Sequence, residues 1–253
     1  MKRLLAALMF VLFFAPTGHC FYGVHTVGTA GTFSGGEPEP GILFQADFEI
    51  DGMITWDSTP AAEDCDGYDY MRDWCDYDTS QYHGGGHSLG ILGGASDAYL
   101  TVNLTGSSTE FYIDGWIRFD NLTINLSLFR IEHADTTMDI SFLILNTGML
   151  YMYHGGGSNQ SAAGLAAIDT WYHIGIYYKQ ESTPGSSGDG IVRVYLRTDA
   201  SAFTYADAVI ENTSVATGTV DADVLFLRGT AVGTTHWYDD VIVGEGDPGW
   251  PDS

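Results

Sequence analysis

The residues best suited to chemistry lie in one acidic and aromatic stretch, residues 64–87, which reads DCDGYDYMRDWCDYDTSQYHGGGH. It holds six aspartates, five tyrosine or tryptophan rings, two cysteines and two histidines. Carboxylates bind cations and accept hydrogen bonds from hydroxyl groups, while aromatic rings stack against the apolar faces of sugars. The composition therefore suits an active site, a metal loop, a sugar-binding loop or a plain connection between strands.

The end of this stretch imitates a hydrolase motif. Gly86–Gly90 (GHSLG) fits the G-x-S-x-G nucleophile elbow, and His83–Gly86 (HGGG) imitates an oxyanion loop. An elbow requires a strand before the serine and a helix after it. Here glycines precede Ser88, and a turn and a strand are expected after it. The pattern therefore does not predict a serine hydrolase.

Two cation sites can be drawn from the same residues. Asp64, Asp66 and Asp69 place carboxylates around a glycine turn, although the downstream glutamate of an EF-hand loop is missing. His83 and His87 flank three glycines and suit a transition metal, but no third ligand is evident. A solvated acidic loop is the alternative.

Two cysteines, Cys65 and Cys75, remain once the N-terminal signal segment described below is removed. A lone pair in an oxidising compartment commonly forms a disulfide, and so small a loop would stabilise the fold by about 2–3 kcal/mol. The alternative, a thiolate metal site, lacks the spacing of zinc fingers. We therefore predict a Cys65–Cys75 disulfide.

Residues 1–20 have the layout of a secretory signal peptide, with Lys2 and Arg3 before an apolar run of about a dozen residues. The run is too short to span a bilayer, so we expect export to the extracellular space or the periplasm and no membrane insertion. The chain has 33 acidic and 9 basic residues and a formal net charge of −24. This charge repels nucleic acid, and it disfavours polyanionic glycans unless a local arginine cluster compensates. Divalent cations and neutral ligands are favoured.

After a Gly- and Thr-rich lead-in at residues 21–41, short apolar runs alternate with turn residues. This spacing predicts an all-β domain at residues 42–244, folded as a two-sheet antiparallel sandwich, with residues 245–253 as a C-terminal tail. No stretch has capped helical periodicity, and only residues 161–168 suit a turn or two of helix. The predicted strands cover residues 42–50, 88–92, 99–104, 110–119, 126–133, 138–145, 150–154, 170–180, 191–198, 223–228 and 235–243.

The tryptophans of these strands are expected to be structural. Alternation places Trp116 and Arg118 on one face of their strand and Ile117 on the other. Large rings within strands usually contribute to packing, so we expect Trp116, Trp171 and Trp237 to lie in the core.

Several segments, in this order, resemble those of a known family. They are GILFQADFE (41–49), HSLGILGGASDAYLTVNL (87–104), EFYIDGWIRF (110–119), DTWYHIGIYYK (169–179), GIVRVYLRTD (190–199), LFLRGTA (225–231) and HWYDDVIVG (236–244). Together they resemble the concanavalin A-like lectin/glucanase jelly roll, of the laminin-G-like kind. The resemblance implies a jelly-roll sandwich that binds or cleaves carbohydrate.

The same resemblance implies a structural calcium ion that joins the first strand to the last. Its side-chain ligands would be Glu49 and Asp239, completed by backbone oxygens, because Ca²⁺ takes six to eight hard oxygen ligands. Otherwise Asp239 caps a turn and Glu49 is a solvated strand residue.

Catalysis on this fold would need further residues. A glycosidase needs two facing carboxylates, and no strand of the Glu-x-Asp-x-Glu type is present. A polysaccharide lyase needs a basic side chain to neutralise a uronate, with His or Tyr as base and acid. The candidates are Arg130, Glu132, His133 and Tyr153. Alternation places Arg130 and Glu132 on one face and His133 on the other.

From the sequence we therefore favour a secreted, non-catalytic, lectin-like domain that is stabilised by Ca²⁺ and binds a neutral glycan. The expected ligand contacts are Tyr68, Tyr70, Trp74, Tyr77, Tyr82 and His83. A polysaccharide lyase or glycoside hydrolase, and an adhesive surface module, are the alternatives. The identity of the glycan and the oligomeric state stay open.

Overall fold

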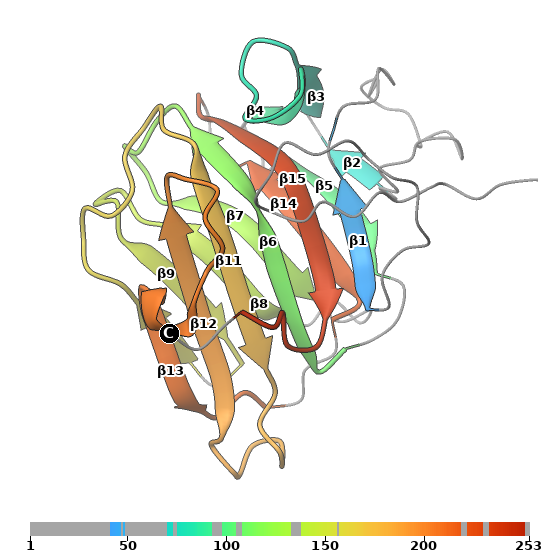
Figure 1. Ribbon diagram of the computed structural model, residues 1–253, viewed down its shortest axis with the longest axis vertical. Coiled ribbons are helices and arrows are strands. Elements are labelled where there is room, and N and C mark those ends of the chain that lie inside the picture. The colour runs from blue at the N-terminus through green and yellow to red at the C-terminus, as the bar shows by residue number, and fades with distance from the viewer. Residues whose placement is uncertain are drawn as a thin grey trace, which may run out of the picture.

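The computed structural model describes residues 41–46, 48, 70–72, 75–92, 98–104, 108–132, 138–155, 157–218, 222–229 and 233–250. In this part of the chain the fold is all-β, and two antiparallel sheets pack as a sandwich (Figure 1). The helical element among these residues is a short 3-10 turn, η1 (Tyr205–Asp207). None of the described residues forms a helix that is long and apolar enough to cross a membrane.

The larger sheet has eight strands, in the order β13-β12-β11-β6-β15-β4-β3, with β1 also paired to β15. The long strand β15 pairs with β4 through one half of its length and with β1 through the other. The strands are β1 (Ile42–Ala46), β3 (Cys75–Asp78), β4 (Ser88–Leu92), β6 (Glu110–Phe119), β11 (Tyr172–Lys179), β12 (Gly190–Arg197), β13 (Ile210–Val215) and β15 (Thr235–Glu245).

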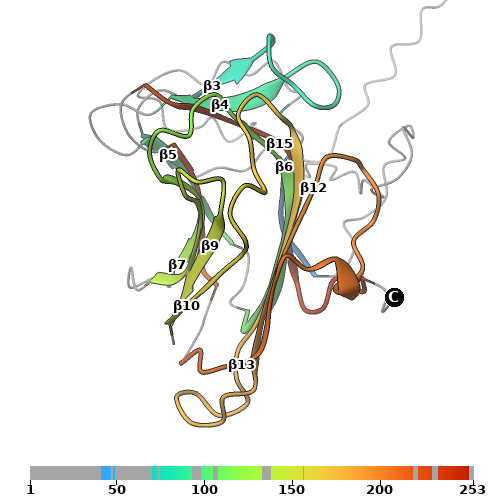
Figure 2. The ribbon, with the colours of Figure 1, turned by 90° about the vertical axis from the view of Figure 1, so that its left-hand side faces the viewer.

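The second sheet has seven strands, in the order β10-β9-β8-β7-β14-β5-β2. They are β2 (Tyr70–Arg72), β5 (Ala98–Asn103), β7 (Leu126–Glu132), β8 (Met138–Ile144), β9 (Leu150–His154), β10 (Gly157–Gln160) and β14 (Val224–Gly229). Figure 2 shows the two layers from the side, with β3 and β4 at their upper end.

Alternate side chains of each strand form the core between the sheets. On β6 the inward residues Phe111, Ile113, Ile117 and Phe119 are fully buried and belong to one continuous apolar cluster. Burial of such side chains contributes about 1.5–3 kcal/mol each. The intervening β6 residues point to the opposite face, which we call the outer face of the eight-stranded sheet. This face carries the polar and aromatic groups considered below.

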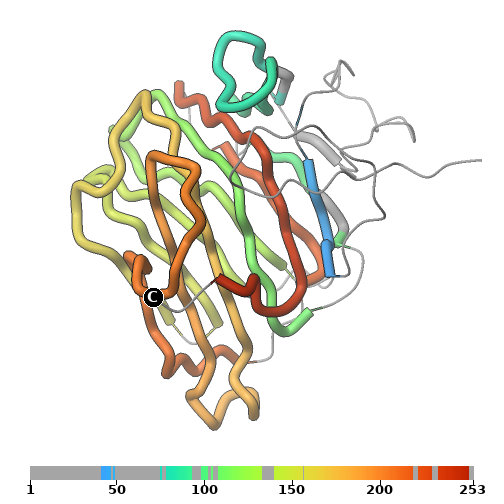
Figure 3. Tube along the Cα trace, in the orientation of Figure 1, coloured from blue at the N-terminus to red at the C-terminus, as the bar shows by residue number. Residues whose placement is uncertain are grey.

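Segments outside the strands lie across the outer face. The chain between β12 and β13 folds back in front of the sheet, and so does the segment that follows β15 (Figures 1 and 3). The Gly246 N–H donates to the Glu110 carbonyl (2.7 Å), which fixes the start of the C-terminal segment against β6. Glu245, predicted to begin a C-terminal tail, is the last residue of β15, and the segment that follows it starts against β6.

Most predicted strands are confirmed, several of them with the same ends, as for β4, β6 and β9. The sequence missed the short strands β2, β3, β10 and β13, which are rich in polar residues and lack clear alternation. Residues 161–168 form turns and no helix, so the prediction of a helical turn there was wrong.

Candidate functional site

The outer face is organised in rows of side chains that cross the strands. Register pairs Trp116 of β6 with Asp239 of β15 on one side and with His173 of β11 on the other. Such neighbours stand about 5 Å apart, so each large ring rests against the next. Asp239 is short, however, and the sheet itself leaves that side of the Trp116 indole uncovered.

A loop between β3 and β4 fills this space, and Asp239 holds it. The Asp239 carboxylate accepts the backbone N–H groups of His83 (2.8 Å) and Gly84 (3.0 Å) through Oδ2, and that of Asp240 (3.0 Å) through Oδ1. Asp239 is only 1% exposed. Asp240 has a positive φ of 48°, within an irregularity in the β15–β6 pairing. The carboxylate thus fixes residues 83 and 84 over the sheet.

The loop places the His83 imidazole on the Trp116 indole. The ring centroids lie 3.4 Å apart at an interplanar angle of 13°, and Trp171 meets the imidazole edge-on at 6.0 Å. Burial of one face, with a smaller contribution from the nearby His173, lowers the pKa of His83 to about 4. The imidazole is therefore neutral at pH 7, although His83 as a residue stays exposed, as does the neighbouring Tyr82.

Charged groups lie beside these rings. Arg118 of β6 forms an ion pair with Asp169 (2.9 Å), and its guanidinium stands 5.3 Å from the Trp237 ring centroid. The Trp237 indole N–H donates to Asp78 Oδ2 (2.7 Å). Partial burial raises the pKa of Asp78, but hydrogen bonds from Ser80 and Trp237 outweigh it and leave that pKa below its ordinary value.

We call the group of exposed or half-buried side chains at this end of the sheet the rim site. It comprises Tyr82, His83, Trp171, Arg118 and Asp169. It combines ring surfaces with one cation and one carboxylate, and its loop is held by buried hydrogen bonds. Such a surface suits a ligand that presents both an apolar face and hydroxyl groups.

A buried polar pair lies next to the rim site. His173 is 1% exposed, and its Nε2 donates to Asp114 Oδ1 (2.7 Å). Its ring stands between Trp116, at 4.9 Å and 18°, and Phe203, at 4.3 Å and 28°. The stack His83–Trp116–His173–Phe203 therefore joins the loop after β3 to the segment after β12.

The described residues predicted for a lyase, Arg130, Glu132 and Tyr153, lie on the other sheet. Arg130 and Glu132 share one face of β7, as predicted, and they form an ion pair with each other. Tyr153 of β9 is 43% exposed, and it aligns with Arg130 through Ser141 of β8. His133 lies outside the described residues. The structure thus brings Arg130, Glu132 and Tyr153 to one sheet, on a different layer from His173.

Several predicted ligand contacts and the predicted disulfide stay predictions. Tyr82 and His83 are on the surface as expected. Tyr70 and Tyr77 lie in β2 and β3. Cys75 lies buried in β3 within the core cluster. Among the residues predicted for the disulfide and the ligand contacts, Cys65, Tyr68 and Trp74 lie outside the described part of the chain.

The predicted calcium site is described in part. Glu49 lies outside the described residues, and so do Asp64, Asp66 and Asp69 of the second candidate site. The oxygens of Asp239 accept three N–H groups, two at Oδ2 and one at Oδ1. Within the described residues no cluster of three or more His, Cys, Asp or Glu side chains suits a metal. Because Glu49 is not described, the structure does not test this site, and the calcium remains a prediction.

The tryptophans were placed only partly correctly by the sequence. Trp116 and Trp237 are 4% and 8% exposed, but they lie on the outer face and not between the sheets. Trp171 precedes β11 and is half-buried at the rim. The roles of Arg118, Asp169 and His173 were also missed. Strand alternation signalled the outward direction of Trp116 and Arg118, but nothing in the sequence indicated the loop that covers them.

Comparison with known proteins supports the fold class but does not show a family. No family model and no curated protein sequence matches the chain. A structure of the alginate lyase Aly36B with an alginate trisaccharide is similar, with a TM-score of 0.53 at 15% identity, covering 82% of this chain and 99% of that one. A sialidase (TM-score 0.55, 12% identity) and the botulinum neurotoxin serotype C1 binding domain (0.54, 10%) are similar over 84% and 82% of this chain. This chain covers 20% and 49% of those two proteins. All of these likenesses show a shared β-sandwich.

Proposed function

We propose that the protein binds carbohydrate at the rim site. The observation that carries the proposal is the exposed His83 ring, stacked on Trp116 and fixed by two hydrogen bonds to the buried Asp239. A pyranose ring has apolar C–H faces that stack on aromatic rings and hydroxyl groups that bond to charged side chains. The His83 and Trp171 rings offer the first kind of contact, and the Arg118–Asp169 pair offers the second.

The fold is compatible with this role. We propose that the sandwich is a concanavalin A-like jelly roll of the laminin-G-like kind; the sequence segments quoted above and the two-sheet topology support this proposal. One similar solved structure is named for an alginate trisaccharide complex, and another for the dependence of botulinum neurotoxin type C on two ganglioside molecules. These names support a carbohydrate ligand for a domain of this shape.

We further propose that the domain is exported and acts without catalysis. The signal-peptide pattern of residues 1–20 supports export. Non-catalytic binding is favoured because Arg130 is already neutralised by Glu132, and because His173 is buried beneath Phe203. Polysaccharide cleavage is the second candidate function, and the Asp114–His173 pair is the observation in its favour.

The deciding experiment is a glycan array followed by calorimetry with the best neutral ligand. We expect His83→Ala and Trp171→Ala each to lower the affinity about tenfold, the value of one lost ring contact. The control is Leu92→Ala, which truncates an exposed apolar residue at the end of β4 and should leave the affinity unchanged.

The same glycans should be incubated with the protein and assayed for new reducing ends and for the ultraviolet absorbance of unsaturated products. Binding without product supports the lectin-like function. Turnover of any polysaccharide would replace it by the enzymatic one. Equal affinities for the wild type and both rim variants would remove the rim site from the proposal.

A further inference from the structure

A second part of the outer face is closed by two segments that come from outside the sheet. We call residues 199–209 and 246–250 the cover. Gly175 of β11 provides the space beneath it: a Cβ atom there would lie 2.7 Å from Phe203 and 2.8 Å from Trp250. The two rings pack against each other at 5.1 Å and against Tyr195 at 5.1 and 4.7 Å. The rings of the cover thus occupy a space that the sheet itself leaves open.

Two polar atoms are buried under the cover without a hydrogen-bond partner in the described residues. They are Nδ1 of His173 and the hydroxyl of Tyr195, which are 1% and 0% exposed as residues. Leaving such groups unsatisfied is unfavourable, and native proteins rarely tolerate it without a functional reason. Since Nε2 of His173 is hydrogen-bonded to Asp114, Nδ1 is the ring nitrogen that a ligand could meet. Both rings contact Phe203 of the cover, and a ring nitrogen and a hydroxyl together complement a ligand that carries hydroxyl groups.

Basic side chains gather on this face of an otherwise acidic protein. Arg118, Lys179, Arg193 and Arg197 all point outward from the eight-stranded sheet, and each is paired with a carboxylate. For Arg197 that carboxylate is Asp207, which belongs to the cover. The guanidinium of Arg193 lies 4.2 Å from the ring centroid of Tyr205, another residue of the cover. The cover therefore places the Asp207 carboxylate on Arg197. It also places the Tyr205 ring over Arg193 and the Phe203 ring on His173.

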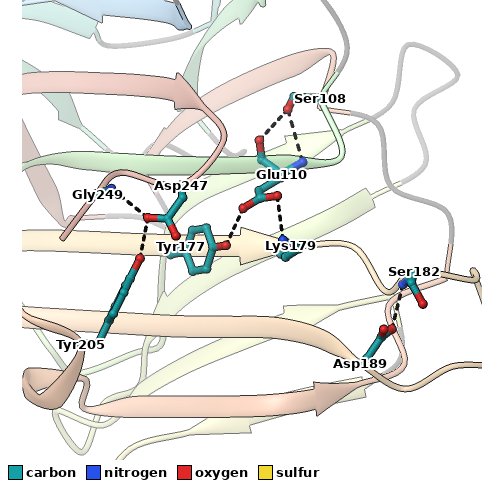
Figure 4. A network of polar contacts seen from close by, with 9 residues as sticks. All are labelled: Ser108, Glu110, Tyr177, Lys179, Ser182, Asp189, Tyr205, Asp247 and Gly249. Atoms are coloured by element: carbon teal, nitrogen blue, oxygen red, sulfur yellow. Dashed lines mark hydrogen bonds and ion pairs between the residues drawn. The ribbon is translucent and has the colours of Figure 1, made fainter. Parts of the chain in front are cut away.

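Among the described residues, hydrogen bonds and ring contacts hold the C-terminal part of the cover in place. The Tyr205 hydroxyl donates to Asp247 Oδ1 (2.5 Å), which also accepts the Gly249 N–H (2.8 Å), as Figure 4 shows. The Gly246 N–H donates to the Glu110 carbonyl. Trp250 is half-buried and packs against aromatic rings. A ligand that stacks on the same aromatic rings and supplies hydrogen bonds can therefore displace residues 246–250.

We propose that the cover occupies a binding site for a saccharide unit that bears a carboxylate, such as a uronic acid. The carboxylate of the sugar replaces Asp207 on Arg197, and its apolar face takes the place of the Trp250 ring against Tyr195. Its hydroxyl groups satisfy Nδ1 of His173 and the Tyr195 hydroxyl. The site is separate from the rim site and does not depend on the neutral-glycan proposal.

The test is calorimetry of the full chain with a galacturonic acid trisaccharide, and with the corresponding neutral galactose trisaccharide. If the cover is open in about a tenth of molecules, Trp250→Ala should bind the acidic trisaccharide about tenfold more tightly than the wild type. The gain should be absent for the neutral sugar, should shrink as salt is raised, and should be lost when Arg197→Gln is added. Leu92→Ala is the control for apolar truncation. Equal affinity of Trp250→Ala and the wild type, or equal binding of both sugars, overturns the proposal.

A second variant guards against misfolding of the first. Tyr205→Phe keeps the ring over Arg193 but removes the hydrogen bond to Asp247, so it should also tighten binding and speed hydrogen exchange of the Gly246 amide. No change in either quantity contradicts the proposal. Adding His83→Ala to Trp250→Ala separates the two sites: binding that persists assigns the acidic sugar to the covered site, and binding that disappears assigns it to the rim.

Discussion

At the scale of single residues, buried carboxylates hold the surface loops of this protein. Asp239 accepts three backbone N–H groups, two of them from a loop more than 150 residues away in sequence. Glu181 has the same role near β13, where it accepts the N–H groups of Gly185 (2.6 Å), Ser187 (3.0 Å), Gly188 (2.8 Å) and Gly218 (2.9 Å). In both cases one charge replaces the regular hydrogen bonds that a loop cannot form with itself.

The stacking of His83 predicts a pH dependence of glycan binding. The folded-state pKa of about 4 lies below the ordinary value of 6.5, so folding of the loop over Trp116 favours the neutral ring. This contribution is fully present above pH 6.5 and is lost as the pH falls towards 4. Titration calorimetry between pH 7.5 and 4 should show the affinity decline in this window, as far as the protein stays folded. His83→Phe should keep a ring on Trp116 and remove the decline; an unchanged decline would point to another group.

Glu181 predicts a second pH effect, on stability. Hydrogen bonds from the Gly188 and Gly218 N–H groups lower the pKa of Glu181 to about 2, from 4.5. The carboxylate therefore stabilises the fold fully above pH 4.5, and this stabilisation disappears as the pH falls from 4.5 towards 2. Glu181→Gln should lower the melting temperature by several degrees at pH 7 and reduce its pH dependence below 4.5. The matched control is Glu245→Gln, an exposed glutamate at the end of β15, which should change neither.

At the scale of elements, the connections between strands depend on backbone dihedral angles and backbone hydrogen bonds at single residues. Gly148, between β8 and β9, has φ +69° and its carbonyl accepts the N–H groups of Leu165 and Ala166, each at 3.0 Å. The turn-forming segment 161–166 is thereby attached to the hairpin. The Ser161 hydroxyl adds to this attachment by accepting the Leu150 N–H (2.9 Å). Gly148 and Ser161 therefore help to position the chain that leads into Trp171 and the rim.

Gly148→Ala should destabilise the protein strongly. A Cβ atom there would lie 2.3 Å from the Ala166 carbonyl oxygen, so the left-handed φ and a steric clash both oppose the methyl group. We expect a loss of about 2–4 kcal/mol in urea unfolding. Gly164→Ala is the control, because its φ is +77° but no atom lies within 4 Å of the added Cβ. It should cost about 1–2 kcal/mol, the strain of the backbone alone. Similar losses for the two variants would contradict the clash.

At the scale of the whole molecule, charge and strand order combine to distinguish one face. The chain carries a net charge of −24, yet β6, β11 and β12 together direct four basic side chains to the outer face of one sheet. Each of these three arginines and one lysine is paired with a carboxylate, so an anionic ligand gains from the cluster only where it replaces such a partner. The opposite sheet presents Arg130 in an ion pair with its own neighbour, Glu132.

The pairing of the first strand, β1, with the last, β15, is where the predicted calcium ion would bind, and a variant of Asp239 tests it. Asp239→Ala should lower the melting temperature because three N–H groups lose their acceptor. If the ion binds Glu49 and Asp239, adding Ca²⁺ should raise the melting temperature of the wild type, EDTA should reverse this, and Asp239→Ala should not respond. A destabilised variant in a protein that never responds to Ca²⁺ would leave Asp239 with its hydrogen-bonding role alone.

The predicted disulfide is also tested at the scale of the whole molecule, by hydrogen exchange. Cys75 is buried in β3, within the core cluster, and a Cys65–Cys75 disulfide is predicted to tether residues 64–87 to it. Cys75→Ser should speed hydrogen exchange in that loop more than in β6 or β11. An equal loss of protection throughout the sandwich would show that Cys75 acts through core packing instead.

The sequence by itself determined the class of fold and much of the strand list. Alternation of apolar and polar residues over Glu110–Phe119 depends only on local geometry, so the ends and the two faces of β6 followed directly. The polar strands β10 and β13 carry no such signal and form because their neighbours supply hydrogen-bonding partners.

Only the tertiary structure decided where the functional surface lies. Trp116 has an aspartate on one side and a histidine on the other because of the register between β15, β6 and β11, whose residues are far apart in sequence. His83 reaches Trp116 because Asp239 binds its backbone, and Trp250 reaches the sheet because Gly175 has no side chain. Contacts of this kind depend on distances between strands and loops, which residue types and local spacing do not encode. The candidate sites therefore emerged from packing, although the residues that form them are visible in the sequence.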